Sequence, residues 1–286
     1  MKLRMYAFLV ALAAMPAPLV VQAQSTASDD AVFTANAPLL DRAIKRGDMI
    51  YAYDQAGWHG TDDLMAKAKA AGVWDTLAPT IGGWIVDGDK HKPTAIFYDK
   101  SEQPKAVYIA SFDEDGEKLV SSRLLGPGDD RTIAPDRLKL IAARNAGRAA
   151  FAAAKLPRCS ESPYNTVVLP PETPGGPTLV YLLTPQTQKD NYPVGGHYLI
   201  EIAADGTAGA PRPFTKSCIA LGAPDGKKPV ALVVSHLLDP VPTEIHVFTM
   251  RAARLPLYVA TSQNGKIWAI EYVNGTRIRM LDPSKK

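Results

Sequence analysis

The sequence lacks the short motifs that mark the commonest nucleotide-binding and hydrolytic sites. Its 286 residues contain no GxxxxGK[ST] phosphate loop, no GxGxxG fingerprint, no HExxH zinc motif, no GxSxG nucleophile elbow and no EF-hand loop. These absences remove the most direct indications of an enzyme. We therefore expect no cofactor, with a zinc ion as the alternative considered below.

An excess of charge of one sign is also lacking. The chain has 32 Lys and Arg residues against 29 Asp and Glu residues. Two of the basic residues, Lys2 and Arg4, lie in the N-terminal segment described next, and without them the balance is 30 against 29. A nearly neutral protein has no electrostatic reason to bind nucleic acid or anionic lipid, so we predict no nucleic-acid partner.

Residues 1–23 have the pattern of an export signal. Lys2 and Arg4 precede an uncharged apolar run over residues 5–15, and small side chains around Ala23 suit cleavage by a signal peptidase. No cysteine follows the run that would accept a lipid anchor. No later segment approaches the roughly 18 apolar residues of a membrane helix. We expect a bacterial envelope protein, periplasmic or secreted, with no transmembrane span after signal cleavage.

Cysteine is scarce, and the two that occur are Cys159 and Cys218. In an oxidising compartment, a small even number of cysteines indicates a disulfide bond. A metal-binding or nucleophilic thiol is the alternative, but neither cysteine lies in a CxxC pair or a recognisable nucleophile motif. We therefore predict a Cys159–Cys218 disulfide.

The hydrophobic pattern predicts an α+β fold with mostly antiparallel sheets. In the N-terminal half, residues 24–156, we expect a polar N-terminus at 24–35, a short helix from Asn36 to Gly47, a strand at 49–53 and a helix at 63–71. Strands separated by turn residues follow at 80–86, 94–98, 106–112 and 118–124. Pro135 then opens a long central helix that reaches about Lys155.

The C-terminal half, residues 157–286, has mostly strand signals, and the two halves are expected to form either separate domains or one unit. Asp-Gly and Asn-Gly pairs predict hairpin turns between several strands. The strands are expected at residues 166–169, 178–183, 197–203, 207–215, 230–236, 244–249, 256–262 and 266–273, with a last short strand after Asn274 and Gly275.

One candidate site contains three histidines. If residues 244–248 form a strand, Glu244 and His246 share one face of it. His236 lies shortly before them, and His197 begins another predicted strand. Three histidines and a carboxylate on adjacent strands would hold zinc for metal-assisted hydrolysis, with Glu244 as general base. The alternative is that these histidines bond to the backbone or form part of a binding surface.

A second candidate lies at residues 53–63, which we predict to be a loop between a strand and a helix. It carries Asp54, Trp58, His59 and Asp62. Loops of this composition often bind ligands, so Trp58, His59 and Asp62 are candidate binding residues. Asp54 and His59 could form a base and its orienting partner beside the zinc site. In the structural alternative, Asp62 caps the helix, Trp58 covers the core and His59 is solvated.

The leading functional hypothesis is an exported, non-enzymatic binding or interaction protein. It depends mainly on the absence of catalytic motifs, and its partner is an unknown protein or small molecule. The alternative is a zinc-type hydrolase that uses His197, His236 and His246 as ligands.

Overall fold

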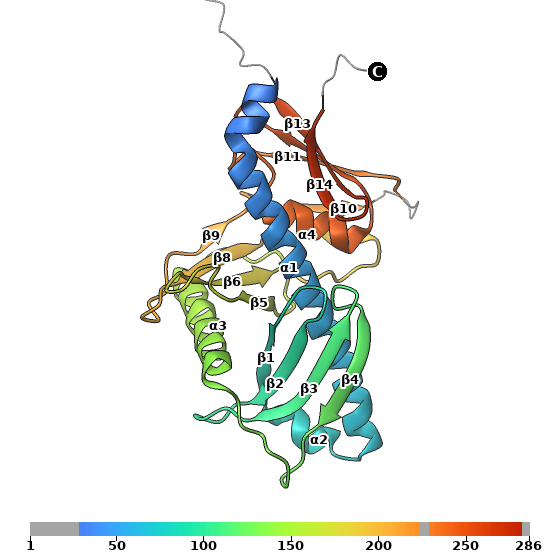
Figure 1. Ribbon diagram of the computed structural model, residues 1–286, viewed down its shortest axis with the longest axis vertical. Helices are drawn as coiled ribbons and strands as arrows, with labels where there is room; N and C mark the ends of the chain where they lie inside the picture. The colour runs from blue at the N-terminus through green and yellow to red at the C-terminus, as the bar shows by residue number, and fades with distance from the viewer. Residues whose placement is uncertain (1–28, 223–228, 282–286) are drawn as a thin grey trace, which may run out of the picture.

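Helix α1 (Asp29–Ala70) is the axis of the molecule, and the three larger sheets are arranged around it (Figure 1). The computed structural model describes residues 29–222 and 229–281. The export signal predicted at residues 1–23 lies outside this range. Helices and antiparallel sheets are present in similar amounts, which confirms the predicted α+β class.

The predicted helix, strand and second helix at the N-terminus are wrong as separate elements, because all of them belong to α1. Residues 29–35, predicted to be a polar tail, also lie in this helix. Every residue from 50 to 56 is buried, so the sequence there has no polar face with helical spacing. An apolar run without that spacing is easily mistaken for a strand.

Gly47 lies inside α1 and does not end a helix there. A Cβ atom at this position would come within 2.4 Å of Cβ of Val247 and 2.8 Å of the carbonyl oxygen of Glu244. Both neighbours belong to helix α4 (Glu244–Ala253), which packs across α1. Glycine therefore allows a close approach of the two helices, at a cost in helix propensity of about 1 kcal/mol relative to alanine.

The four predicted N-terminal strands are present and pair in sequence order as an antiparallel sheet. One turn of helix α2 (Trp74–Leu77) and the 3₁₀ turn η1 (Ala78–Thr80) lead into this sheet. Its strands are β1 (Ile81–Asp87), β2 (Thr94–Asp99), β3 (Ala106–Asp113) and β4 (Lys118–Leu124). Phe97 and Tyr108 pack edge to face on the inner side, and the Tyr108 hydroxyl donates to Asp63 of α1 at 2.6 Å.

Helix α3 (Pro135–Ala154) confirms the predicted central helix and packs on a second antiparallel sheet. The strands of this sheet are β5 (Asn165–Leu169), β6 (Thr178–Leu183), β8 (Tyr198–Ile202) and β9 (Arg212–Pro213). The strand predicted at residues 207–215 is reduced to β9 and a single bridge at Ala208. A separate two-stranded sheet pairs β7 (Asn191–Pro193) with β10 (Ala220–Gly222).

The C-terminal sheet contains the one parallel strand pair among the described residues. Its strands are β11 (Leu232–His236), β12 (Leu257–Thr261), β13 (Lys266–Tyr272) and β14 (Thr276–Met280). Strands β11 and β12 are parallel, and α4 connects them. The strand predicted at residues 244–249 is therefore wrong. Thr243 starts α4 because its backbone N–H donates to Nδ1 of His246 at 3.0 Å, the reciprocal bond of a capping box.

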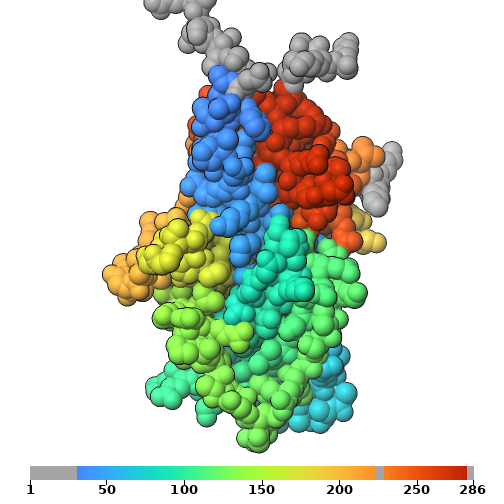
Figure 2. Space-filling view, viewed as in Figure 1, coloured from blue at the N-terminus to red at the C-terminus, as the bar shows by residue number. Residues whose placement is uncertain are grey.

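Residues of both predicted halves share one hydrophobic core around the middle of α1. In Figure 2 the C-terminal sheet lies beside the upper part of α1, and the N-terminal sheet lies below it. The predicted disulfide between Cys159 and Cys218 is confirmed, with 5.3 Å between the Cα atoms. No helix within residues 29–222 and 229–281 has the length and hydrophobicity of a membrane-spanning segment.

Candidate functional site

The three histidines of the first candidate are all buried and lie near one another. The rings of His236 and His246 meet edge to face with 4.6 Å between their centroids. His197 packs in the same way against Phe248 of α4, at 6.2 Å. The three histidines therefore lie close together, as the zinc hypothesis requires. Because residues 244–253 form a helix and not a strand, the side chains that face one another differ from those expected.

Neighbouring groups already engage most of the imidazole nitrogens. His197 accepts a hydrogen bond at Nδ1 from the Thr184 N–H and donates from Nε2 to the Pro193 carbonyl, at 3.1 and 3.0 Å. Burial lowers the pKa of His197 to about 4, so the ring is neutral at pH 7. His236 bonds through Nε2 to Asp239 at 2.9 Å. Each of these rings is held in place by the fold.

His246 differs because Nε2 is buried without a hydrogen-bond partner among the described residues. Its Nδ1 accepts from the Thr243 N–H, which assigns the proton to Nε2. Burial, followed by the electrostatic effect of the neighbouring His236, lowers the pKa of His246 to about 3. This residue is a neutral structural histidine that caps α4.

Glu244, the predicted general base, pairs with Tyr181 and Arg46 and not with the histidines. Its Oε1 accepts a hydrogen bond from the Tyr181 hydroxyl at 2.9 Å and lies 3.9 Å from a guanidinium nitrogen of Arg46. Across the part of the chain that the structure describes, no three His, Cys, Asp or Glu side chains are grouped so that they could hold a metal ion. The geometry therefore offers the zinc hypothesis no ligand set there.

The residues of the second candidate lie on α1, and the predicted loop is wrong. Helical spacing separates them by face: Asp54 and Trp58 are four residues apart and share one side of the helix. The Trp58 indole stacks on the His59 ring, with 4.8 Å between centroids. Asp54 bonds to Asn165 of β5 rather than to His59, and Asp62 is exposed on the helix surface.

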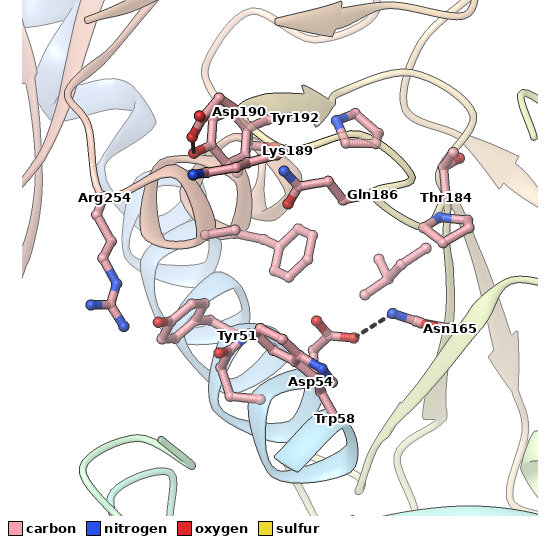
Figure 3. A pocket seen from close by; sticks show the side chains of 17 residues that line it. Tyr51, Asp54, Trp58, Asn165, Thr184, Gln186, Lys189, Asp190, Tyr192 and Arg254 are labelled. Atoms are coloured by element: carbon pink, nitrogen blue, oxygen red, sulfur yellow. Dashed lines mark hydrogen bonds between the residues drawn. The ribbon is translucent and has the colours of Figure 1, made fainter. Parts of the chain in front are cut away.

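Asp54 and Trp58 line a pocket of about 550 Å³ between α1, α4 and the chain from the end of β6 through β7 (Figure 3). Helix α1 contributes a row at positions i, i+3, i+4 and i+7, namely Tyr51, Asp54, Gln55 and Trp58. The other lining residues are Asn165, Leu183, Thr184, Pro185, Gln186, Lys189, Asp190, Tyr192, Pro193, Phe248, Thr249, Ala252 and Arg254.

The inner part of this pocket is formed by one buried carboxyl group and neutral side chains. Asp54 is 9% exposed, and its Oδ1 accepts from the Asn165 side-chain amide at 3.1 Å (Figure 3). No described Lys, Arg or His forms an ion pair with it, and its Oδ2 has no hydrogen bond within the described structure. Burial raises the pKa of Asp54 to about 6, against the opposing effect of the Asn165 bond. Asp54 is therefore mostly ionised at pH 7 and lacks a counter-ion.

Two further features show how the pocket is bounded. Thr249 of α4 lines it, and the Thr249 hydroxyl is buried without a hydrogen-bond partner among the described residues. At the mouth, Lys189 and Asp190 are exposed, and Arg254 forms an ion pair with Glu117. The mouth thus carries both signs of charge, whereas the buried interior carries one negative group.

The histidine cluster supports one wall of the pocket. His197 bonds to the backbone of Thr184 and Pro193, and both of these residues line the pocket. Sequence reasoning selected Asp54 and Trp58 but missed Asn165, Thr184 and Phe248. No local signal identifies these three, because they meet α1 only through the tertiary fold. Comparison with family models, with curated proteins and with solved structures found no match.

Proposed function

We propose that the protein is exported across the bacterial inner membrane and binds a small organic molecule in the pocket around Asp54. The pocket is the observation that supports this proposal: its size falls in the range typical of small-molecule sites, and both apolar and polar side chains line it. Asp54 is the one carboxylate, amine or imidazole lining the pocket that is also buried.

A binding role suits this arrangement better than hydrolysis. General acid–base hydrolysis normally uses two positioned groups, such as a nucleophile and its base. Within the described pocket, the hydrogen bond to Asp54 comes from Asn165, an amide that does not titrate. The disulfide and the signal-like residues 1–23 support the exported location.

A blocked pocket tests the binding function. Ala252→Trp would fill the pocket from α4, and Ala149→Trp on the exposed side of α3 is the matched control. A metabolite library is screened by thermal shift, and the hits are measured by calorimetry. We expect ligands that bind the wild type and A149W but bind A252W at least tenfold more weakly. A screen without hits, or hits that bind A252W equally well, would contradict the proposal.

Export is tested separately, by mass spectrometry of the protein from a periplasmic extract. We expect the mass of a chain that starts at Gln24, with two hydrogens fewer than the reduced form because of the disulfide. An uncleaved chain that is found only in the cytoplasm would contradict this part of the proposal.

A further inference from the structure

We infer that the ligand of this pocket is an organic ammonium ion, in which a protonated amine pairs with Asp54 and an apolar or aromatic body fills the remaining space. This inference rests on the proposed binding function and adds the chemical class of the ligand.

The charge of the pocket interior is the first observation that favours an ammonium ligand. The carboxyl group of Asp54 is nine-tenths buried, lines the pocket and accepts its one described hydrogen bond from a neutral amide, that of Asn165. A buried ion without a partner of opposite charge is costly. A ligand ammonium supplies that charge and a donor to Oδ2, whereas an anionic ligand would be repelled.

The aromatic side chains on either side of Asp54 along α1 are the second observation. Trp58, one turn further along the helix, is 57% exposed and stacks on His59 with its indole ring. Tyr51, one turn before Asp54, already has the Arg251 guanidinium over its ring at 4.4 Å from the centroid. Trp58 is therefore the aromatic group on this face that is left to contact a ligand cation, by the cation–π attraction for which tryptophan is best suited.

Apolar side chains that line the pocket across from α1, beside Thr184 and Thr249, are the third observation. Leu183 at the end of β6 and Phe248 and Ala252 on α4 line the pocket. These three side chains offer a polyol no hydrogen-bond partner, but they accommodate a hydrocarbon or an aromatic ring. An amine joined to such a body matches both the carboxylate and the wall.

Three probes of nearly equal shape test the charge preference. They are 2-phenylethylamine, 2-phenylethanol and phenylacetate, measured by calorimetry against the wild type at pH 8. We expect the amine to bind at least tenfold more tightly than the alcohol, and phenylacetate not to bind. Equal or tighter binding of the alcohol or of phenylacetate would overturn the ammonium assignment. A thermal shift of the protein with calcium chloride, together with no shift with 2-phenylethylamine, would also overturn the assignment.

Variants then place the amine at Asp54. We expect Asp54→Asn to weaken 2-phenylethylamine at least tenfold and leave 2-phenylethanol unchanged. Asp62→Asn removes an exposed carboxylate two turns along the same helix and should change neither affinity. Trp58→Ala should weaken the amine more than the alcohol. Unchanged amine binding in D54N, or an equal loss in D62N, would contradict the assignment.

The pH dependence gives an independent check. If only the ionised form of Asp54 binds the ammonium, a carboxyl with a pKa of about 6 predicts about tenfold weaker binding at pH 5 than at pH 8. The amine stays protonated throughout, and D54N should show no such change. If no probe binds at all, the ammonium assignment fails. The proposed function fails with it only when the metabolite screen also finds no ligand that A252W excludes.

Discussion

Replacing Asp54 by asparagine should stabilise the ligand-free protein at neutral pH. Asparagine keeps the shape of the side chain and an acceptor oxygen for the Asn165 amide, so the substitution removes little besides the charge. Burial raises the pKa of this carboxyl from 3.8 to about 6. A pKa that is higher in the folded state than in the unfolded chain contributes stability below about pH 4, and this contribution is lost as the pH rises through 6.

The size of the effect follows from the same shift. A difference of about two pKa units corresponds to about 3 kcal/mol between the two protonation states. Above pH 7 the wild type carries this cost in full, and D54N does not. We expect the free energy of unfolding of D54N minus that of the wild type to rise by about 2.5 kcal/mol between pH 4 and pH 8, mostly between pH 4 and pH 6.

Urea unfolding of the oxidised, ligand-free proteins, followed by circular dichroism, measures this difference. His197 and His246 act in the opposite direction, because burial lowers their pKa values to about 4 and 3. The stability they contribute is present above pH 6.5 and is lost as the pH falls. Both histidines remain in the variant, so their effects cancel in the difference. D62N should show a flat difference curve. A flat curve for D54N, or a D54N protein that is less stable at pH 8, would refute the reasoning.

Three further variants test how the fold holds the site, each by urea unfolding. His246→Gln keeps an acceptor for the α4 cap but removes the buried imidazole, so its stability relative to the wild type should rise by up to about 3 kcal/mol as the pH falls from 7 to 4.5; a fall would contradict this. Replacing Cys159 and Cys218 by serine should cost about 4 kcal/mol, since the bond spans 59 residues, and an unchanged midpoint would argue against a structural bond. Gly47→Ala should destabilise by about 1–3 kcal/mol despite the better helix propensity of alanine, because its methyl group meets α4, whereas stabilisation would show that the helices can separate at no cost.

The hairpins and the central helix could be predicted because their signals are local. Asp115–Gly116 and Asn264–Gly265 stand at the β3–β4 and β12–β13 turns, between segments with strand composition. Pro135 stands at the first position of α3, where its missing N–H is no loss. The disulfide was predicted from two cysteines and the signal-like pattern of residues 1–23, with no geometric information.

The middle of α1 and nearly all of α4 could not be predicted as helix because other elements bury these segments on nearly all sides. Nine of the ten residues of α4 are buried, so β-branched and aromatic side chains stand where an exposed helix would carry polar ones. The periodicity that distinguishes a helix from a strand is then absent. Gly47 contributed to the wrong prediction that a helix ends there, because glycine is found at the ends of helices far more often than at the contact between two crossing helices.

The pocket, too, could be predicted only in part from the sequence, because it depends on how the elements pack together. Tyr51, Asp54 and Trp58 have a spacing that places them on one face of a helix, and only the mistaken loop hid this face. Even with the helix known, the spacing could not tell a covered face from a pocket wall, because that depends on α4 and on the chain around Thr184. A rigid helix also positions a carboxylate more closely than a loop does. The free energy of unfolding of a domain is typically only about 5–15 kcal/mol, so an unpaired charge that costs about 3 kcal/mol removes a large fraction of the stability of the ligand-free protein. A ligand cation that pairs with Asp54 offsets this electrostatic cost. The free energy gained by the pairing then contributes to the affinity for the ligand.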